Sequence, residues 1–456
     1  MFLKVLRLLF VLVIIFTTAC SSNDDTMTPV IIEALNDNVT VSQNSEVEIF
    51  IFANDTNIPN SGELSITTPS KGMAIIIDEN STPNNPSDDF IKFSPNANET
   101  GTDSFEYTIC NNGNTCQTAT VNITITSSSS VNFDLDSMPF QSLSEYQLFE
   151  GELSLLEPSF GVVPYELISS LFTDYAKKKR YIWMPNNTKA SYEGDAAMLN
   201  FPVGTIIVKN FYYDNVLPEN DTKIIETRLL IRKPEGWIFA EYVWNDAQTE
   251  AFLDMNGSYV DIEWTQDGET KSTSYRIPSG PECFTCHKVQ EVAQPIGPKP
   301  RNLNKTLEFA DGNFNQLEKL IAMGYLENNV PSNVSAVPDY RDVSEPLELR
   351  ARAYLDINCA HCHSEGTHCD YRPMRLDFES TSDPTNIGVC VSPDTDLGLG
   401  LGDIVIPGDP RNSVLHFRMN SNEPSNRMPL LGRNIIHTEG VALIEQWIEN
   451  LSIDCD

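Results

Sequence analysis

The chain has 456 residues and a mass of 51.0 kDa, which exceeds one ordinary domain and predicts about three. Apolar residues make up 40% and charged residues 21%, a globular composition that argues against wholesale disorder. The net charge of −34 repels phosphate, so we expect no nucleic-acid partner and no polybasic docking to anionic lipid. Ten cysteines need an explanation.

The N-terminus has the pattern of a secretory signal. Residues 1–19 begin with Lys4 and Arg7, continue as an apolar run, and end in small residues before Cys20. The stretch Thr-Thr-Ala-Cys that ends at Cys20 resembles a bacterial lipobox, which implies cleavage before Cys20 and its lipidation. We therefore expect an outer-membrane lipoprotein, periplasmic or surface-exposed, that is attached to the membrane through Cys20. Residues 20–29 are the expected tether, and the other cysteines lie in an oxidising compartment.

Residues 30–127 alternate apolar and polar side chains in short runs, as an all-β domain does. The apolar faces of two late strands are Phe105, Tyr107 and Ile109, and then Ala119, Val121, Ile123 and Ile125. Cys110 and Cys116 flank the turn between these strands. We expect a disulfide across this hairpin.

The pattern "ANDT … GTDSFEYTI … ATVNITI" in this region resembles bacterial immunoglobulin-like (Ig-like) or cadherin-like modules. The resemblance implies a β-sandwich, which we interpret as a spacer. The alternative is a ligand- or Ca²⁺-binding module that uses Asp55 or Asp103. The serine run that follows predicts a linker over residues 128–136.

The remaining chain changes from strands to helices along its length. Residues 137–330 are predicted to be a β-rich domain with a short helix near residues 165–175. Its clearest strand patterns lie at 205–208, 227–231 and 237–244. Helical periodicity is found at 315–323, at 345–357 and from about residue 438 onward. Residues 331–456 are accordingly the predicted helical domain.

The motif Cys-x-x-Cys-His occurs twice, at residues 283–287 and 359–363. In c-type cytochromes the two thiols bind the vinyl groups of a haem, and the histidine is the proximal iron ligand. Two such motifs behind a secretion signal predict two covalently bound haem c groups. The predicted attachment residues are Cys283, Cys286, Cys359 and Cys362, and the predicted axial ligands are His287 and His363.

Three other interpretations of these cysteines compete with haem. Paired Cys-x-x-Cys sequences also build structural zinc sites or thioredoxin-like redox pairs, and they could close two small disulfides. Zinc does not require a histidine directly after both second cysteines, and the chain has only six histidines. A thioredoxin-like pair belongs at a strand-to-helix junction of an α/β fold, which is not predicted here. We therefore favour haem.

The surroundings of the second motif carry a further resemblance. A helix, Cys-x-x-Cys-His, a long loop, Met-Pro and a final helix follow one another over about residues 335–456. This order resembles a class I cytochrome c domain, which implies an all-α cytochrome c-like fold with Met428 as distal ligand. A thioether favours Fe(II) and raises the potential. The rival ligands are Met374, Met419, His416 and His437. In the long loop, Cys369 and Cys390 are a candidate disulfide, unless Cys455 replaces one of them.

The first motif has different surroundings. No histidine precedes His287, so a second histidine ligand could come only from the C-terminal part of the chain. Met323 is the preferred distal candidate, and an open or weakly ligated iron is the alternative. Residues 295–298, Pro-Ile-Gly-Pro, resemble the segment whose carbonyl holds the proximal histidine in cytochromes c. Such a bond would orient His287.

Residues 144–330 contain "VVPYELISSLFTDYAKKKRYIWMP", "FPVGTIIVKNFYYDN" and "PECFTCHK … PIGPKPRNLN". These segments resemble an uncharacterised family of diheme c-type cytochromes, and the resemblance spans about 310 residues across both haem domains. The segment "FPVGTIIVKNF" before a Cys-x-x-Cys-His is more faintly similar to cytochrome P460. Lys209 would match its crosslinking lysine by position. Because the chain continues well past the motif, P460 catalysis is not carried over.

These features together predict an extracytoplasmic diheme cytochrome that transfers electrons. The acidic surface favours a redox partner with a basic docking surface. One alternative is a haem enzyme, peroxidase-like or P460-like, with an open first haem. The other is a surface binding protein whose Ig-like module carries the main role.

Overall fold

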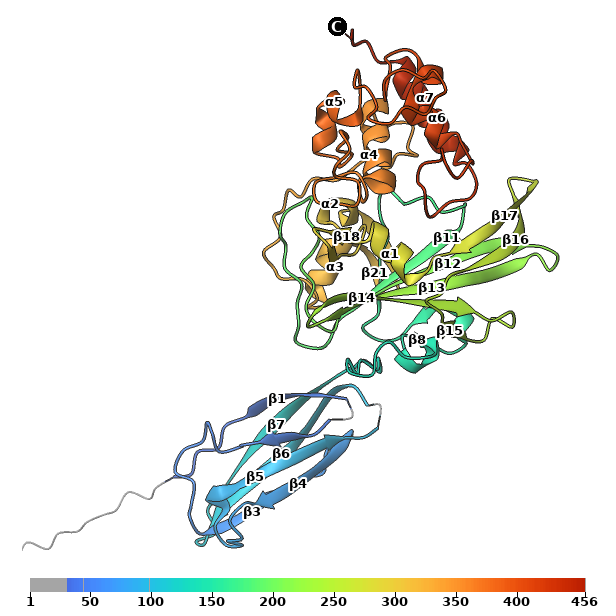
Figure 1. Ribbon diagram of the computed structural model, residues 1–456. Helices are drawn as coiled ribbons and strands as arrows, with labels where there is room; N and C mark the ends of the chain where they lie inside the picture. Colours follow the sequence, from blue (N-terminus) through green and yellow to red (C-terminus); the bar gives the residue numbers. More distant parts are fainter. Residues whose placement is uncertain (1–30, 44, 98, 456) are drawn as a thin grey trace, which may run out of the picture. The chain divides into compact units, whose positions relative to one another are not determined.

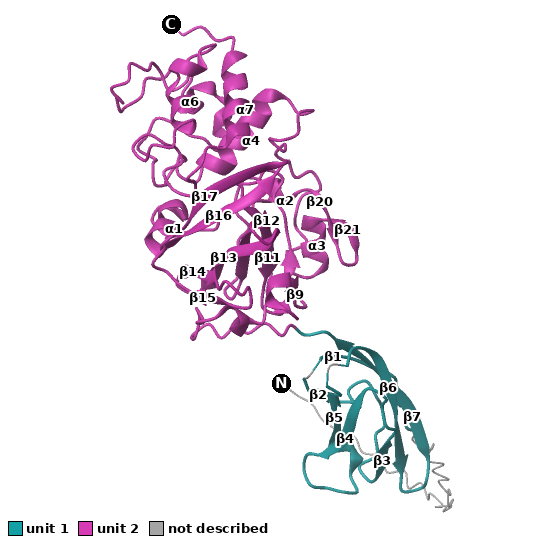
Figure 2. Ribbon diagram, turned by 90° about the vertical axis from the view of Figure 1, so that its right-hand side faces the viewer, with its two compact units in different colours: residues 1–128 teal, residues 129–456 magenta. Residues whose placement is uncertain are grey.

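The computed structural model describes residues 31–43, 45–97 and 99–455 (Figure 1). The expected signal peptide, Cys20 and the tether 20–29 lie outside the described residues. Within the described ranges, none of the helices combines the length and hydropathy that crossing a bilayer requires. The chain divides into two compact units, unit 1 (residues 1–128) and unit 2 (residues 129–456), coloured separately in Figure 2.

Unit 1 is a β-sandwich. One sheet has the strand order β1-β7-β6-β3, with β1 parallel to β7, and the other has the order β2-β5-β4. The strands are β1 (Asp37–Ser42), β2 (Val47–Ile49), β3 (Gly62–Ile66), β4 (Gly72–Asp78), β5 (Asp89–Pro95), β6 (Gly101–Asn111) and β7 (Cys116–Thr126), with a 3₁₀ turn, η1 (Pro86–Asp88), before β5. The predicted apolar faces of β6 and β7 are buried in the core between the sheets. The Ig-like N-terminal domain is thereby confirmed.

The hairpin of β6 and β7 is closed as expected, because Cys110 and Cys116 form a disulfide. The two carboxylates of the Ca²⁺ alternative bind the chain itself. Asp103 accepts hydrogen bonds from the backbone N–H groups of Ser70 (3.1 Å) and Lys71 (2.7 Å). Asp55 accepts from the hydroxyl of Tyr107 at 2.7 Å. Both residues therefore hold loops of the sandwich together.

Unit 2 is built on an eight-stranded antiparallel sheet. Its main path is β10-β11-β12-β13-β14-β15, and β16 pairs with β12 and with β17. The strands are β10 (Val163–Pro164), β11 (Lys177–Trp183), β12 (Ile206–Val216), β13 (Asp221–Lys233), β14 (Gly236–Trp244), β15 (Ala251–Leu253), β16 (Ser258–Gln266) and β17 (Glu269–Ile277). The three strand patterns predicted in this region are confirmed as parts of β12, β13 and β14.

Smaller elements surround this sheet. Two-stranded ribbons are formed by β8 (Phe149–Glu150) with β9 (Glu157–Pro158), β18 (Lys288–Val289) with β19 (Val292–Ala293), and β20 (Thr306–Phe309) with β21 (Gly312–Asn315). The 3₁₀ turns are η2 (Leu143–Tyr146), η3 (Leu153–Leu155), η4 (Ser380–Ser382) and η5 (Pro410–Asn412). The side chain of Val131 lies in the core of this unit, and Trp183 donates to the hydroxyl of Ser129. The stretch expected to be a linker is therefore partly packed.

The helices of unit 2 are α1 (Gly280–Cys286), α2 (Pro300–Leu303), α3 (Gln316–Ala322), α4 (Leu347–Cys359), α5 (Pro384–Ile387), α6 (Val414–Met419) and α7 (Thr438–Glu449). The predictions that correspond to α3, α4 and α7 are confirmed, with α4 beginning and ending two residues later than expected. The helix predicted near residues 165–175 is wrong, because this segment forms bends and turns. Its backbone instead bonds to other segments, as in the 2.8 Å bond from the Phe172 N–H to the Asn358 side chain.

Both predicted haem-binding regions fall within unit 2 and share one apolar core. Ile207 and Leu230 of the sheet belong to the same buried cluster as Leu355 of α4 and Trp447 of α7. Between residues 331 and 455 the named elements are helices, and one isolated bridge pairs Val389 with Val405. Helices α4, α6 and α7 lie together beyond the strands (Figure 1).

One predicted disulfide is corrected. Cys390 pairs with Cys455, and Cys369 is a free thiol. The last residues after α7 return to the loop that carries Cys390, so the Cα atoms of this pair are 5.4 Å apart. Cys369 is held elsewhere, because its backbone N–H donates to the carbonyl of Cys362 at 2.8 Å.

Candidate functional site

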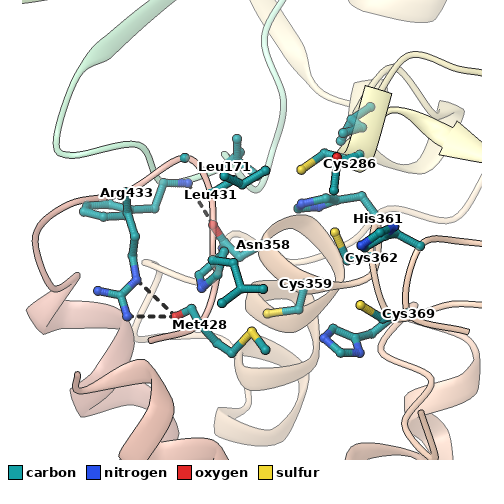
Figure 3. A pocket seen from close by; sticks show the side chains of 18 of the residues that line it. Leu171, Cys286, Asn358, Cys359, His361, Cys362, Cys369, Met428, Leu431 and Arg433 are labelled. Carbon is teal, nitrogen blue, oxygen red and sulfur yellow. Dashed lines mark hydrogen bonds between the residues drawn. The ribbon is translucent and has the colours of Figure 1, made fainter. Parts of the chain in front are cut away.

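Both Cys-x-x-Cys-His motifs line one cavity of unit 2. Its volume is about 450 Å³, within the range of small-molecule and cofactor sites. The lining includes all six motif residues that carry the predicted chemistry, Cys283, Cys286, His287, Cys359, Cys362 and His363, together with Met428. A close view is given in Figure 3.

The first motif lies on α1, which begins directly after β17. Ser279 is the N-cap, and the carboxylate of Glu282 accepts from its N–H at 2.7 Å and its hydroxyl at 2.9 Å. Arg276 at the end of β17 holds the same carboxylate at 2.7 Å. The His287 N–H then donates to the carbonyl of Cys283 at 3.0 Å, so the motif is one helical turn. The sheet edge and the cap together fix where the thiols face.

The ring of His287 is oriented by the chain that follows it. Its Nδ1 lies 3.0 Å from the carbonyl oxygen of Gln294, and its ring centroid is 5.4 Å from that of Phe239. Burial lowers the pKa of His287 to about 3, so the imidazole is neutral. A neutral ring that donates from Nδ1 keeps its lone pair on Nε2, which is the arrangement of a metal ligand. The carbonyl belongs to Gln294, directly before the Pro-Ile-Gly-Pro segment from which it was expected.

The second motif repeats this geometry at the end of α4. The N–H groups of Cys362 and His363 both donate to the carbonyl of Cys359 at 3.0 Å. His363 is buried, and burial lowers its pKa to about 4. Its Nδ1 has no hydrogen-bond partner among the described residues. Two neutral histidines thus occupy corresponding positions in the two motifs.

Met428 lies in the loop between α6 and α7, and its side chain extends toward Cys359 (Figure 3). The loop is held from within by the buried guanidinium of Arg433. This group donates to the Met428 carbonyl from Nε at 3.0 Å and from Nη2 at 2.9 Å. Nη2 also lies 3.0 Å from the carbonyl of Met419 and 2.8 Å from that of Ser421. The backbone at Met428 is therefore fixed.

The other ligand candidates are distributed unevenly. Met374, Met419 and His437 line the cavity, whereas His416 does not. His437 is already engaged, because its ring stacks on Phe172 at 4.1 Å and its Nδ1 lies 3.1 Å from the hydroxyl of Tyr354. Met323 caps the end of α3, packs beside the apolar core and does not line the cavity. Met428 therefore lines the cavity that the two motif histidines also line, and Met323 does not.

The two motifs meet at a cluster that was not expected. One ligand atom each of Cys286, His361 and Cys362 lie within 4.8 Å of one another. Figure 3 shows these side chains together on the side of the cavity away from Met428. Hydrogen bonds from Cys362 and His361 lower the pKa of Cys286 to about 4 despite its burial. The motif did not indicate a role for His361, because this residue occupies one of its variable positions.

A row of charged side chains lines the cavity beside the first motif. Lys209, Arg228 and Glu241 are cross-strand neighbours on β12, β13 and β14. Arg228 Nε lies 3.1 Å from Glu241, and Arg228 also pairs with Glu226 on its own strand. Burial raises the pKa of Glu241 well above its usual value and lowers that of Lys209 well below its own. The sequence carried no signal for this row of residues. Strand pairing brings the three together, and no local pattern links them.

The donor set of the cavity fits covalently attached haem. All four motif thiols are free, as attachment to vinyl groups requires. Each motif presents a neutral histidine, and a neutral thioether shares the cavity with them. Cys286, His361 and Cys362 form what we call the thiol–imidazole cluster. By itself this cluster would also suit a soft metal ion such as Zn²⁺.

Comparison with known families identifies the N-terminal domain. A family model described as Bacterial Ig domain matches residues 23–124. This agrees with the sandwich of unit 1. The match ends before the Cys-x-x-Cys-His motifs, so their function is inferred from their own chemistry. No curated protein matches the chain.

Similar solved structures were also found. A 2,6-sialyltransferase of Photobacterium sp. JT-ISH-224 is 17% identical over 22% of this chain, with a TM-score of 0.16. The chain spans only 19% of that enzyme's length. Cadherin domains 1–4 of protocadherin gamma B7 are 10% identical over 55% of this chain and 76% of theirs, with a TM-score of 0.17. The extracellular domain of protocadherin gamma B4 is 8% identical over 54% and 48%, with a TM-score of 0.18. We draw no conclusion from likenesses this weak.

Proposed function

We propose that this protein is an extracytoplasmic diheme c-type cytochrome that transfers electrons. One haem c is attached to Cys283 and Cys286, and the other to Cys359 and Cys362. The observation that carries the proposal is that both Cys-x-x-Cys-His motifs, with free thiols and neutral histidines, line one cavity. Bound haem supplies an iron that accepts and returns one electron.

The histidines of the motifs are the proximal ligands in this proposal. For His287, the Gln294 carbonyl fixes the ring and leaves Nε2 for the iron. At the second centre Met428 would hold the iron, and its soft, uncharged sulfur would favour Fe(II) and so raise the potential. The order of α4, motif, loop, Met-Pro and α7 supports a cytochrome c-like arrangement of residues 331–456.

The cluster of Cys286 and Cys362 supports direct electron exchange between the centres. Each is the second cysteine of its motif, and their sulfur atoms lie within 4.8 Å. The two attachment points are therefore neighbours. Because electron tunnelling falls steeply with distance, such neighbours suit a carrier that passes single electrons through both centres.

The rest of the chain suits a tethered carrier. In this proposal a lipid on Cys20 holds the protein at the outer membrane, and the Ig-like domain is a spacer. The net charge of −34 steers the carrier toward a partner with a basic docking surface. The association rate would then fall as ionic strength rises.

Haem staining and intact mass of protein matured with the haem-attachment machinery test the proposal. We expect a mass increase of two haems, reduced to one when Cys283 and Cys286, or Cys359 and Cys362, are both replaced by Ser. Replacing Cys369, a free thiol outside both motifs, serves as control and should leave two. Protein without haem but with stoichiometric zinc would contradict the proposal and assign the thiol–imidazole cluster to zinc.

A second candidate is a haem enzyme whose reactive centre is the first haem. The charged row of Lys209, Arg228 and Glu241 favours it, because acid–base groups line the cavity beside Cys283 while Met323 does not reach it. Electron paramagnetic resonance separates the candidates. A carrier predicts two low-spin ferric signals, whereas a dominant high-spin signal would favour the enzyme.

A further inference from the structure

A cluster of ionisable groups is buried in the sheet beside the first motif. Glu226 and Glu241 are 0% and 1% exposed, and the guanidinium of Arg228 lies between them. The hydroxyl of Tyr275 on β17 donates to Glu226 at 2.6 Å. We refer to Glu226, Arg228, Glu241 and Tyr275 as the carboxylate cluster.

The charges around this cluster do not cancel when both acids are ionised. Arg228 is the cation held charged, since the two carboxylates raise its pKa despite burial. Lys209 of β12 and Lys178 of β11 face the cluster, but burial lowers the pKa of both well below the usual value. On α1, Cys283 faces Glu241, and Glu282 is paired with Arg276. The single positive charge of Arg228 therefore lies beside two buried carboxylates, Glu226 and Glu241.

The hydrogen bonds distinguish the two acids. One oxygen of Glu226, Oε1, accepts from both the Tyr275 hydroxyl and the Arg228 guanidinium, while its Oε2 has no hydrogen-bond partner among the described residues. Among the described residues, neither oxygen of Glu241 has a hydrogen-bond partner of good geometry, although Arg228 Nε lies 3.1 Å from one of them. Burial and the neighbouring Glu226 raise the pKa of Glu241. Glu241 is therefore the member that can change its protonation.

Glu241 is coupled to the first motif by position. It lines the same cavity as Cys283 and His287. It also contacts Met255, and Met255 in turn binds the first residue of α1. The Glu241 N–H lies 3.4 Å from the Met255 sulfur, and the Met255 carbonyl accepts from Gly280 at 3.0 Å. For so buried a carboxylate, a negative charge gained nearby favours uptake of a proton.

We propose that Glu241 takes up a proton when the first haem centre gains an electron, and that it releases the proton on oxidation. The inference rests on the proposed function. The electron would be supplied by a one-electron donor protein and held by the bound haem. The proton comes from bulk water, and the bond formed is an O–H bond on Glu241. The Arg228 side chain, 21% exposed, links the cluster to solvent. The first centre would thus serve partners that exchange a proton together with an electron.

Redox titration of the diheme protein between pH 5 and pH 9 tests this inference. The midpoint potential of the first haem should fall as pH rises, with a slope approaching about 59 mV per pH unit, the value for one proton per electron. The haem whose potential does not respond to Met428→Ala is assigned as the first. A redox difference infrared spectrum should show a protonated carboxyl that forms on reduction.

Glu241→Gln should flatten the slope for the first haem and remove the infrared carboxyl signal. Glu263→Gln is the matched control, because Glu263 is exposed on β16 of the same sheet. A first haem whose potential is independent of pH in the unaltered protein would overturn the inference even if Glu241→Gln does not fold. Absence of bound haem would instead refute the proposed function, so the two failures are distinguishable.

Discussion

Arg433 donates two hydrogen bonds to the carbonyl of Met428, from Nε at 3.0 Å and Nη2 at 2.9 Å. The same loop is held from the β-rich half, where one carboxylate oxygen of Asp174 accepts from the N–H groups of Asn434 (2.7 Å) and Ile435 (3.1 Å). A buried cation within the loop and a buried anion outside it therefore determine where Met428 lies. The proposed role of Met428 as an iron ligand calls for such support, because a thioether is a soft, uncharged ligand.

Arg433→Lys is expected to weaken methionine ligation at the second haem. A lysine ammonium is one point of charge and cannot reach the several carbonyls that the guanidinium binds. Buried carbonyls left without donors should also lower the free energy of unfolding by about 2–4 kcal/mol. When the pH is raised, the methionine–iron charge-transfer band of the variant should disappear at a lower pH than that of the parent protein. Arg427→Lys in the same loop is the control, since Arg427 donates to the Asn434 side chain. An unchanged band in Arg433→Lys would remove Arg433 from this role.

Met428→Ala should abolish the methionine–iron charge-transfer band and lower the potential of one haem, because the soft ligand that favours Fe(II) is lost. Met323→Ala should leave the band and both potentials unaltered, since Met323 caps α3 outside the cavity. Absorption spectra and redox titration of both variants provide the measurement. A band lost in Met323→Ala and retained in Met428→Ala would reverse the assignment.

The parts of the site that were predictable from the sequence are those written in consecutive residues. The two motifs needed no knowledge of the fold, and the hairpin of Cys110 and Cys116 followed from strand alternation on either side of a short turn. Helical periodicity likewise identified α3, whose apolar face buries Leu317 and Leu320. Local pattern determines such features because neighbours in sequence remain neighbours in space.

The parts that were not predictable depend on which distant segments meet. Periodicity placed Met323 at the end of a helix but could not say which way that end faces. The charged row of Lys209, Arg228 and Glu241 is assembled by strand register across β12, β13 and β14. Nothing in the spacing of Cys369, Cys390 and Cys455 indicated that the chain end returns to the loop after α5.

The Cys390–Cys455 disulfide should stabilise unit 2. It closes a loop with a sequence separation of 65, so its removal releases considerable loop entropy in the unfolded chain. Replacing both residues by Ser is expected to cost about 2–4 kcal/mol and to lower the thermal midpoint. Cys369→Ser, at a free thiol, should leave that midpoint unchanged. Peptide mapping under non-reducing conditions provides the structural check, and a bond that includes Cys369 would contradict the pairing.

Asp37 should make unit 1 less stable as pH rises. Burial and the neighbouring Asp55 raise its pKa from 3.8 to about 6, and its Oδ2 has no hydrogen-bond partner among the described residues. Between about pH 4 and pH 6 the folded state therefore binds more protons than the unfolded state, so stability falls across this window and the loss persists above it. Asp37→Asn should remove the loss. Because the group is partly solvated, we expect a gain of about 1 kcal/mol at pH 7 and none at pH 3.5.

Chemical denaturation of unit 1 alone, which has its own apolar core, measures this effect at the two pH values. Glu63→Gln on β3 is the matched control, because this exposed carboxylate also loses one negative charge. A general reduction of the unit's acidity would stabilise both variants equally at pH 7. The local explanation requires that Asp37→Asn gain stability at pH 7 beyond Glu63→Gln and that the difference vanish at pH 3.5. Equal gains would assign the effect to net charge and not to the burial of Asp37 beside Asp55.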